Sequence, residues 1–233
     1  MTYDLNIPIS FQLDRTAIDR LKLILSRLSR FNDCTVALNY STDNVNSKKH
    51  LRPIEINDLF DFSTLQSSHS LKIINRLTIQ TDQPLMHEEI ESLKAHFDLI
   101  ALRTSSLDVF RSACASYDID LISLDCKERL AFELNTRDIQ LALDRDIYFE
   151  LCYAPSIRDN QLKTYTIQLA KQLFEYTKGH KLIISSEAEF VSEIRNPADI
   201  FYFAKAIGLP NDLAKFTVEK HPEQLMERKR MKH

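Results

Sequence analysis

Residues 148–153 read Tyr-Phe-Glu-Leu-Cys-Tyr, a short apolar run with one carboxylate near its centre. Side chains alternate between the two faces of a strand, so Glu150 shares a face with Tyr148 and Cys152. An amphipathic helical pattern follows over residues 162–173. A short apolar strand followed by such a helix is the repeating unit of a parallel sheet covered by helices on its faces.

The same unit recurs along the whole chain. Short apolar runs predict strands at residues 3–7, 35–39, 72–79, 98–102, 120–124, 148–153 and 182–185. Helical patterns separate most of these runs, and Thr16-x-x-Asp19 predicts the start of the first helix as a capping box. About seven to eight β-α units in series favour a TIM-barrel-like (β/α) barrel over a doubly wound sheet.

The pattern also predicts how the chain is divided. We expect a single (β/α) barrel domain over residues 1–215, interrupted by a long polar loop at 41–70, which contains Lys48, Lys49 and His50. Residues 216–233 are expected to form a helical, basic C-terminal end. No secretory leader and no membrane span is predicted, so the chain reads as an intracellular protein.

Composition excludes several classes of function. The chain contains only Gly179 and Gly208, so neither a G-x-G-x-x-G turn nor a Walker A loop can be written. Its formal charge of −3, from 30 basic and 33 acidic residues, excludes nucleic-acid binding through bulk positive charge. Any such contact needs a local patch. The four cysteines form neither a disulfide pattern nor a zinc ribbon.

Several predicted strands carry one polar residue among apolar ones. Asn39, either Asn75 or Arg76, and Glu150 are placed in this way. Barrel strands point alternate residues inward, so Arg76 and Glu150 are positioned to meet inside the barrel. Two interpretations remain open: a buried structural ion pair, and a binding or catalytic cluster at the carboxyl ends of the strands.

Catalytic motifs are scarce. Barrel metallohydrolases usually carry H-x-H on the first strand, whereas residues 4–8 read Asp-Leu-Asn-Ile-Pro, so no metal site is predicted. His87-Glu88-Glu89 does not extend to the zinc motif H-E-x-x-H, because position 91 is Glu. A carboxylate pair of Asp125 and Glu150 leaves a divergent barrel hydrolase as the alternative function.

Basic residues gather in loops after the predicted strands or at helix ends, where arginines and free N–H groups suit phosphate oxygens. An ordinary solvated surface is the other interpretation of each of them. The residues are Arg103, Lys127, Arg129, Arg158, Lys178 and Arg195.

A series of motifs, in order along nearly the whole chain, closely resembles the thirty-kilodalton protein subunit shared by ribonuclease P and ribonuclease MRP. The resemblance is weakest at 41–70 and after Lys215. The motifs include Asp4-Leu5-Asn6, Arg76-Leu77-Thr78-Ile79, Leu107-Asp108-Val109-Phe110-Arg111, Lys127-Glu128-Arg129-Leu130, Tyr148-Phe149-Glu150-Leu151, Thr177-Lys178-Gly179, Ile183-Ile184-Ser185-Ser186 and Glu193-x-Arg195-Asn196-Pro197-x-Asp199.

The resemblance implies a TIM-barrel-like fold related to barrel phosphoesterases but without their metal site. It implies a non-catalytic subunit that binds no cofactor and braces a catalytic RNA, which removes precursor tRNA leaders with its own magnesium. The implied partners are the ribonuclease P and MRP RNAs, a small α+β subunit and other particle proteins, and the implied location is the nucleus and nucleolus. The implied RNA-facing residues are Arg76, Arg103, Lys127, Arg129, Arg158, Lys178 and Arg195.

Three positions depart from the family pattern. Asp146 stands where a glycine usually ends the helix before Tyr148, and Asp can also take that conformation at some cost. Asn196 stands where the family has glycine, and it still suits the start of a helix as an N-cap. Glu187 stands where a small residue is usual, and it is expected to place a carboxylate near the RNA-facing surface. A barrel that binds only proteins is a third possible function.

Overall fold

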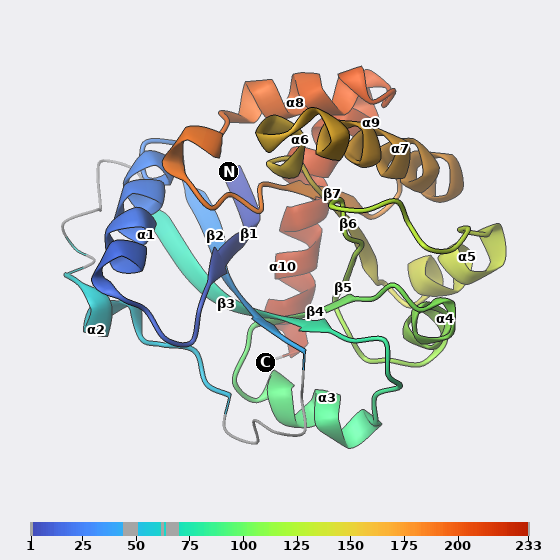
Figure 1. Cartoon of the computed structure of the whole chain (residues 1–233), viewed down its shortest axis with the longest axis horizontal. Helices are drawn as coiled ribbons and strands as arrows, with labels where there is room; N and C mark the ends of the chain where they lie inside the picture. Colours follow the sequence, from blue (N-terminus) through green and yellow to red (C-terminus); the bar gives the residue numbers. More distant parts are fainter. Residues whose placement is uncertain (1, 44–50, 62, 64–69, 233) are drawn as a thin grey trace.

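The structure is a computed structural model that describes residues 2–43, 51–61, 63 and 70–232. Seven parallel strands form one sheet in the order of the chain, with a helix after most strands (Figure 1). The strands are β1 (Thr2–Ile9), β2 (Cys34–Thr42), β3 (Leu71–Gln80), β4 (Leu99–Arg103), β5 (Leu121–Ser123), β6 (Tyr148–Cys152) and β7 (Leu182–Ser185). The predicted (β/α) barrel is confirmed, and each strand overlaps one of the predicted runs.

Helices surround the sheet on its outer side, except for the C-terminal helix, which crosses one end of the barrel (Figure 1). The helices are α1 (Arg15–Leu28), α2 (Ile56–Leu59), α3 (His87–Lys94), α4 (Leu107–Ala115), α5 (Thr136–Asp144), α6 (Pro155–Arg158), α7 (Asn160–Thr177), α8 (Pro197–Ala206), α9 (Asn211–Lys215) and α10 (His221–Lys232). The 3-10 turn η2 (Val191–Glu193) and the π-helical segment η3 (Phe216–Lys220) complete the path. None of the described helices is both long and apolar enough to cross a membrane.

Strand burial explains the layered arrangement. All five residues of β4 and all five of β6 are buried, because helices cover the outer face and other strands face the interior. The loop predicted at 41–70 contains α2, while its residues 44–50, with Lys48, Lys49 and His50, and residues 62 and 64–69 lie outside the described residues.

The start of α1 differs from its prediction. The N-cap is Asp14, whose carboxylate accepts a hydrogen bond of 2.7 Å from the backbone N–H of Ala17. The motif Thr16-x-x-Asp19 is therefore already inside the helix. Either residue type can cap a helix, so the sequence alone did not distinguish Asp14 from Thr16.

The barrel closes between β1 and β7 through a few polar contacts and without a strand ladder. The carboxylate of Asp4 accepts a hydrogen bond of 3.0 Å from the backbone N–H of Ser186. The next residue, Glu187, donates its N–H to the carbonyl of Asn6 at 2.9 Å. The barrel is nearly closed, and Asp4 is part of its seam.

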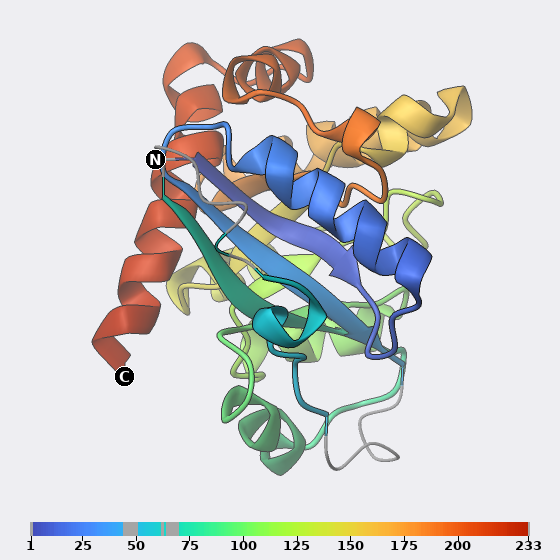
Figure 2. The same ribbon diagram turned by 90° about the vertical axis from the view of Figure 1, so that its left-hand side faces the viewer.

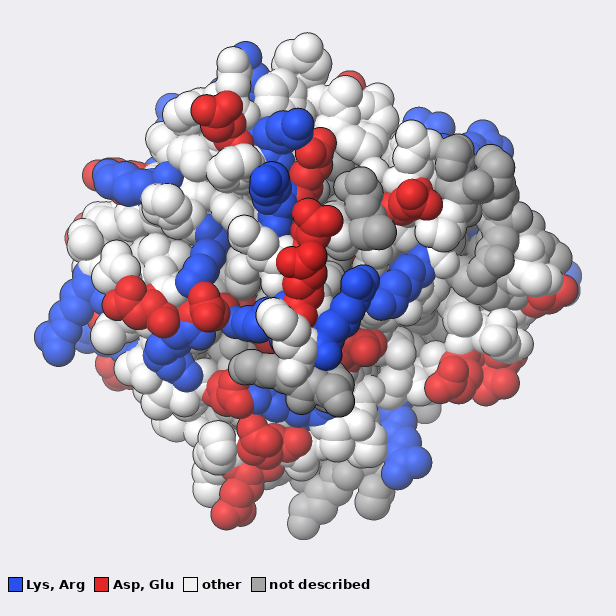
Figure 3. Space-filling view, turned by 180° about the vertical axis from the view of Figure 1, so that it is seen from behind, with Lys and Arg blue, Asp and Glu red and all other residues white. Residues whose placement is uncertain are grey.

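The C-terminal helix α10 covers the amino-terminal end of the barrel, where it lies across the beginnings of β1, β2 and β3 (Figure 2). Leu225 and Met226 are buried in one apolar cluster with inward-facing residues of the strands. Arg228 and Lys229 both form ion pairs with Asp120. Two residues of the predicted basic end, Arg228 and Lys229, therefore form ion pairs within the fold. Seen from behind, basic and acidic side chains are interleaved on this face (Figure 3).

Candidate functional site

The inside of the barrel changes character along its axis. Near the amino-terminal ends of the strands the interior is apolar, with residues such as Leu5, Ala101 and Ile183 packed against α10. Toward the carboxyl ends, each strand contributes a polar side chain. This polar layer includes Asn6, Asn39, Arg76, Thr78, Arg103, Ser123 and Glu150. The candidate site is this layer and the loops above it, which is where barrel enzymes hold their active sites.

Arg76 and Glu150 form the centre of the layer. The guanidinium of Arg76 on β3 donates to the two carboxylate oxygens of Glu150 on β6, at 2.5 and 2.7 Å. It also donates to the carbonyl of Leu5 on β1 at 2.7 Å. Both charged side chains are fully buried. One arginine therefore links three separate strands across the interior.

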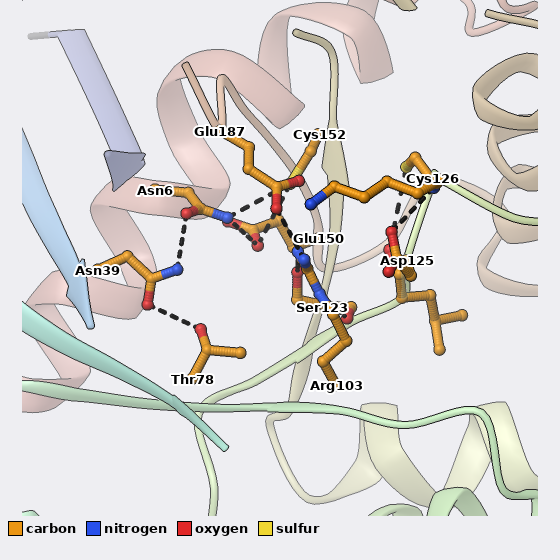
Figure 4. A network of polar contacts seen from close by, with 12 residues as sticks. Asn6, Asn39, Thr78, Arg103, Ser123, Asp125, Cys126, Glu150, Cys152 and Glu187 are labelled. Carbon is orange, nitrogen blue, oxygen red and sulfur yellow. Dashed lines mark hydrogen bonds and ion pairs between the residues drawn. The ribbon is translucent and has the colours of Figure 1, made fainter. Parts of the chain in front are cut away.

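A chain of amide and hydroxyl groups extends from this pair toward β2 (Figure 4). Asn6 donates to Glu150 at 3.2 Å and accepts from the amide of Asn39 at 2.8 Å. The hydroxyl of Thr78 in turn donates to the amide oxygen of Asn39 at 2.8 Å. Buried polar groups need such partners, so this network fixes the orientation of every member.

A second buried ion pair lies above the first. Arg103 donates to Glu187 at 2.7 Å and to the hydroxyl of Ser123 at 3.0 Å (Figure 4). Glu187 has a φ of +55°, a left-handed conformation that turns its side chain into the barrel mouth. Glu187 was expected to place a carboxylate near the RNA-facing surface, and in the structure that carboxylate is buried against Arg103.

The network sets the charge of its carboxylates. Burial alone would raise the pKa of Glu150, but the charge and hydrogen bonds of Arg76 outweigh burial and lower it to about 2. For Glu187, burial is likewise outweighed by Arg103, and the pKa is lowered. Asp4 has no cationic partner of this kind among the described residues, and burial raises its pKa to about 6 despite hydrogen bonds from Ser186. Glu150 and Glu187 are thus ionised and held by arginines.

This arrangement does not favour the hydrolase alternative. Glu150 is sealed from solvent and permanently paired, so it has no position from which to accept a proton from a substrate. Asp125 accepts from the backbone N–H of Lys127 at 2.8 Å and lines a separate pocket of about 400 Å³ at the barrel mouth. Among the described residues, no three His, Cys, Asp or Glu side chains gather in a group suited to a metal ion.

The structure buries two of the residues that were expected to contact RNA. Arg76 has no exposed surface, and Arg103 is 7% exposed. Both guanidinium groups form ion pairs with carboxylates inside the barrel. Arg76 therefore cannot reach a phosphate in this conformation, and Arg103 presents only a small surface to the pocket at the barrel mouth. The sequence predicted that Arg76 and Glu150, 74 positions apart, meet inside the barrel, but it did not predict the pairing of Arg103 with Glu187, 84 positions away.

The other five basic residues do not form one surface. Arg158 is held by Glu193 at 2.6 Å, and Arg195 donates to the carbonyl of Ser192 at 2.7 Å. Lys127 and Arg129, like these two, follow strands and lie at the carboxyl end of the barrel; both side chains are exposed. Lys178 is also exposed, but it precedes β7 and therefore lies at the opposite end.

Sequence reasoning missed several members of the network. Asp4, Asn6, Thr78 and Glu193 were not singled out as site residues, although each has a defined partner. Asp4 and Asn6 carried a usable signal, because they are polar residues at alternate positions among apolar residues of the first strand. Glu193 carried a signal only as part of the family motif Glu193-x-Arg195, since its contact with Arg158 spans 35 positions.

The fold and site together define a (β/α) barrel whose mouth is filled by arginine–carboxylate pairs where a barrel hydrolase needs open ligands. The chain belongs to the family of RNase P subunit p30, whose family model matches residues 1–233. The resemblance seen in the sequence is thereby confirmed.

Individual relatives agree with this assignment. Over 189 residues, the chain is 31% identical to ribonuclease P protein subunit p30 of Mus musculus, covering 78% of this chain and 70% of the mouse protein. It is 25% identical over 221 residues to ribonuclease P/MRP protein subunit RPP1 of Saccharomyces cerevisiae, covering 91% of this chain and 75% of the yeast protein.

A solved structure has the same fold. A chain in the cryo-EM structure of archaeal ribonuclease P with mature tRNA superimposes with a TM-score of 0.70 at 16% identity. The match covers 98% of this chain and 91% of the archaeal one. The barrel is thus the shared architecture, and the low identity limits the comparison to the fold.

Proposed function

We propose that this chain is a non-catalytic protein subunit of a ribonuclease P ribonucleoprotein, and of ribonuclease MRP. The observation that carries the proposal is the family match over the full 233 residues. In this role the barrel helps to fold and brace an RNA that removes the 5′ leaders of precursor tRNA, and it serves precursor rRNA processing in the MRP particle.

The chemistry is assigned to the RNA, together with magnesium ions bound on it. The side chains that occupy the barrel mouth support this division of roles. Two arginine–carboxylate pairs fill the place where substrate and general base would meet, and both carboxylates of these pairs are held by arginines. The protein contribution is therefore shape and positive charge at defined points.

The proposed RNA contacts are the exposed members of the expected set. Lys127 and Arg129 stand at the carboxyl end, and within the described residues neither forms an ion pair. Arg158 and Arg195 are secondary candidates because their side chains are already engaged. Phosphate contacts of this kind weaken steeply as salt is raised. The proposed partners also include a small α+β subunit of the particle, and the proposed location is the nucleus and nucleolus.

A mild affinity purification of the tagged chain from its own cells tests the proposal. The co-purified RNA is sequenced, and the eluate is assayed on a precursor tRNA with and without magnesium. We expect one or two structured RNAs and magnesium-dependent removal of the leader. Nuclease treatment of the eluate should abolish the activity.

Other outcomes would select another function. Protein without RNA, but with a stable set of protein partners, would indicate a purely protein-binding barrel. Leader removal that survives complete digestion of the RNA would return the activity to the protein. A Glu150→Gln variant would then be compared with the wild-type chain for turnover.

A further inference from the structure

A pocket of about 570 Å³ lies at the amino-terminal end of the barrel, away from the site described above. It is bounded by the end of α5, the end of α7 with the loop that follows it, and η3 with the start of α10. Two kinds of side chain dominate its wall. The basic and aromatic ones are Tyr176, Lys178, His180, Lys181, Phe216, Lys220 and His221.

The positive charge in this pocket is largely free. Lys178, His180 and Lys220 are exposed, and none of them forms an ion pair within the part of the chain that the structure describes. Lys181 is already paired with Asp146. The acidic group on the wall is Asp144, and one of its oxygens accepts from Gln140 at 2.7 Å. Because basic side chains outnumber acidic ones on the wall, the pocket favours the binding of an anion.

Aromatic rings stand beside these cations. Phe216 is half-buried, and the ammonium of Lys220 lies 5.7 Å from the centroid of its ring. Tyr176 on α7 is also half-buried and lines the same pocket. A partly exposed ring flanked by lysines is a combination that suits unpaired nucleotides, since the ring stacks on a base and the lysines bind the phosphates.

The pocket wall is rigidly built from unusual backbone. Lys178 and Lys181 adopt left-handed conformations with φ of +53° and +49°, which are costly for residues with a side chain. Between them, Gly179 packs so closely on Leu213 that an added Cβ would lie 2.8 Å from a methyl group. The opposite wall is π-helical, a geometry that is often found at functional sites.

We propose that this pocket binds an unpaired nucleotide of the particle's RNA, with Lys178 and Lys220 on the phosphates and Phe216 against the base. The inference rests on the proposed function and deepens it by placing a second RNA contact at the opposite end of the barrel from Lys127. On the face that carries α10, basic and acidic side chains are interleaved and form no broad basic surface (Figure 3). This agrees with RNA binding at a local site.

The test compares two double variants in the particle purified from cells through the tagged chain. Lys178→Glu with Lys220→Glu reverses two charges in the pocket. Lys163→Glu with Lys171→Glu makes the same change at exposed positions of α7 that do not line the pocket. Retained RNA is measured over a series of salt concentrations, and circular dichroism establishes that both variants are folded.

We expect the pocket variant to lose at least tenfold in RNA affinity and the control variant to stay within about twofold. The slope of log affinity against log salt should fall by about 1.4, since two single-strand phosphate contacts are lost at about 0.7 each. Phe216→Leu should lose about 5- to 100-fold with an unchanged salt slope, because stacking releases no counterions. Ultraviolet crosslinking of wild-type particle should attach RNA to the peptide that contains Phe216.

The failures are distinguishable. If the wild-type chain recovers no RNA, the proposed function falls and this inference falls with it. If the wild-type chain holds its RNA and the pocket variant holds it equally well, only the inference is overturned. Loss of a protein subunit with RNA retained would assign the pocket to an acidic protein segment and would also overturn the inference.

Discussion

The guanidinium of Arg76 and the carboxylate of Glu150 meet in the centre of the barrel at 2.5 Å, and neither side chain has any exposed surface. The two residues come from β3 and β6, which are separated by two other strands in the sheet. The pair therefore connects distant walls of the barrel. It lies toward the end of the barrel at which barrel enzymes hold their active sites, and here it serves as internal support.

Removing one member of this pair should be costly. Glu150→Gln keeps the shape of the side chain but leaves the cation of Arg76 buried without its counter-charge, so the free energy of unfolding should fall by about 3–5 kcal/mol. Urea unfolding followed by circular dichroism measures the change. The matched control is Glu219→Gln, which breaks an exposed pair with Lys215 and should cost at most about 0.5 kcal/mol.

Replacing both members should cost less than replacing one. In Arg76→Met with Glu150→Leu, no unpaired charge remains in the interior, and apolar residues of similar volume take its place. If the double variant were as unstable as Glu150→Gln, the loss would come from altered packing and not from the isolated charge.

Asp4 should make the protein more stable in mild acid. Its pKa is raised by burial from 3.8 to about 6, so the folded state binds the proton more tightly than the unfolded state does. The stability contributed by protonated Asp4 is complete below about pH 4 and is lost as the pH rises through about 6. At 1.36 kcal/mol per unit, the loss is about 3 kcal/mol.

The variant Asp4→Asn should flatten the stability profile between pH 4 and 6, because the amide does not titrate. Glu150 acts in a separate window, because its pKa is lowered to about 2; its contribution is present above about pH 4.5 and is lost as the pH falls. Unfolding curves over pH 2–8 separate the two. An unchanged slope between pH 4 and 6 in Asp4→Asn would contradict the assignment.

The packing of α10 over the amino-terminal end of the barrel should be important for the stability of the fold. Leu225 is fully buried among the inward-facing residues of the strands, so Leu225→Ala should lower the free energy of unfolding by about 2–5 kcal/mol. Met231 lies on the same helix and is 82% exposed, so Met231→Ala should change it by less than about 0.5 kcal/mol. Equal effects of the two variants on thermal unfolding would mean that α10 does not seal the barrel.

The two glycines should respond differently to alanine. Both have positive φ, so each substitution has a backbone cost of about 1–2 kcal/mol. At Gly208 the added Cβ meets open space, whereas at Gly179 it overlaps Leu213. Gly179→Ala should therefore be the more destabilising change. In a double-mutant cycle with Leu213→Ala, the coupling should be favourable by about 1 kcal/mol, because the smaller side chain removes the overlap; additive effects would argue against close packing there.

The strands and their order along the chain could be predicted from local sequence pattern. Short apolar runs such as 148–153 are buried on both faces wherever they are placed in a covered parallel sheet, so local pattern was enough. It also placed Asn39 and Glu150 on the face that points inward, since alternation along a strand is a local property. Asn196 was recognised as an N-cap for the same reason, and its side chain accepts from the N–H of Asp199.

Apart from the pair of Arg76 and Glu150, the roles of the charged residues depend on the tertiary structure. Whether an arginine faces solvent or a buried carboxylate depends on partners far away in the chain, as Arg103 and Glu187 show. The use of Arg228 on Asp120, and the closing of the barrel by α10, depend in the same way on contacts between distant segments. Pairing energies of this kind are set by distance and burial in three dimensions, and neither quantity is written in a local pattern.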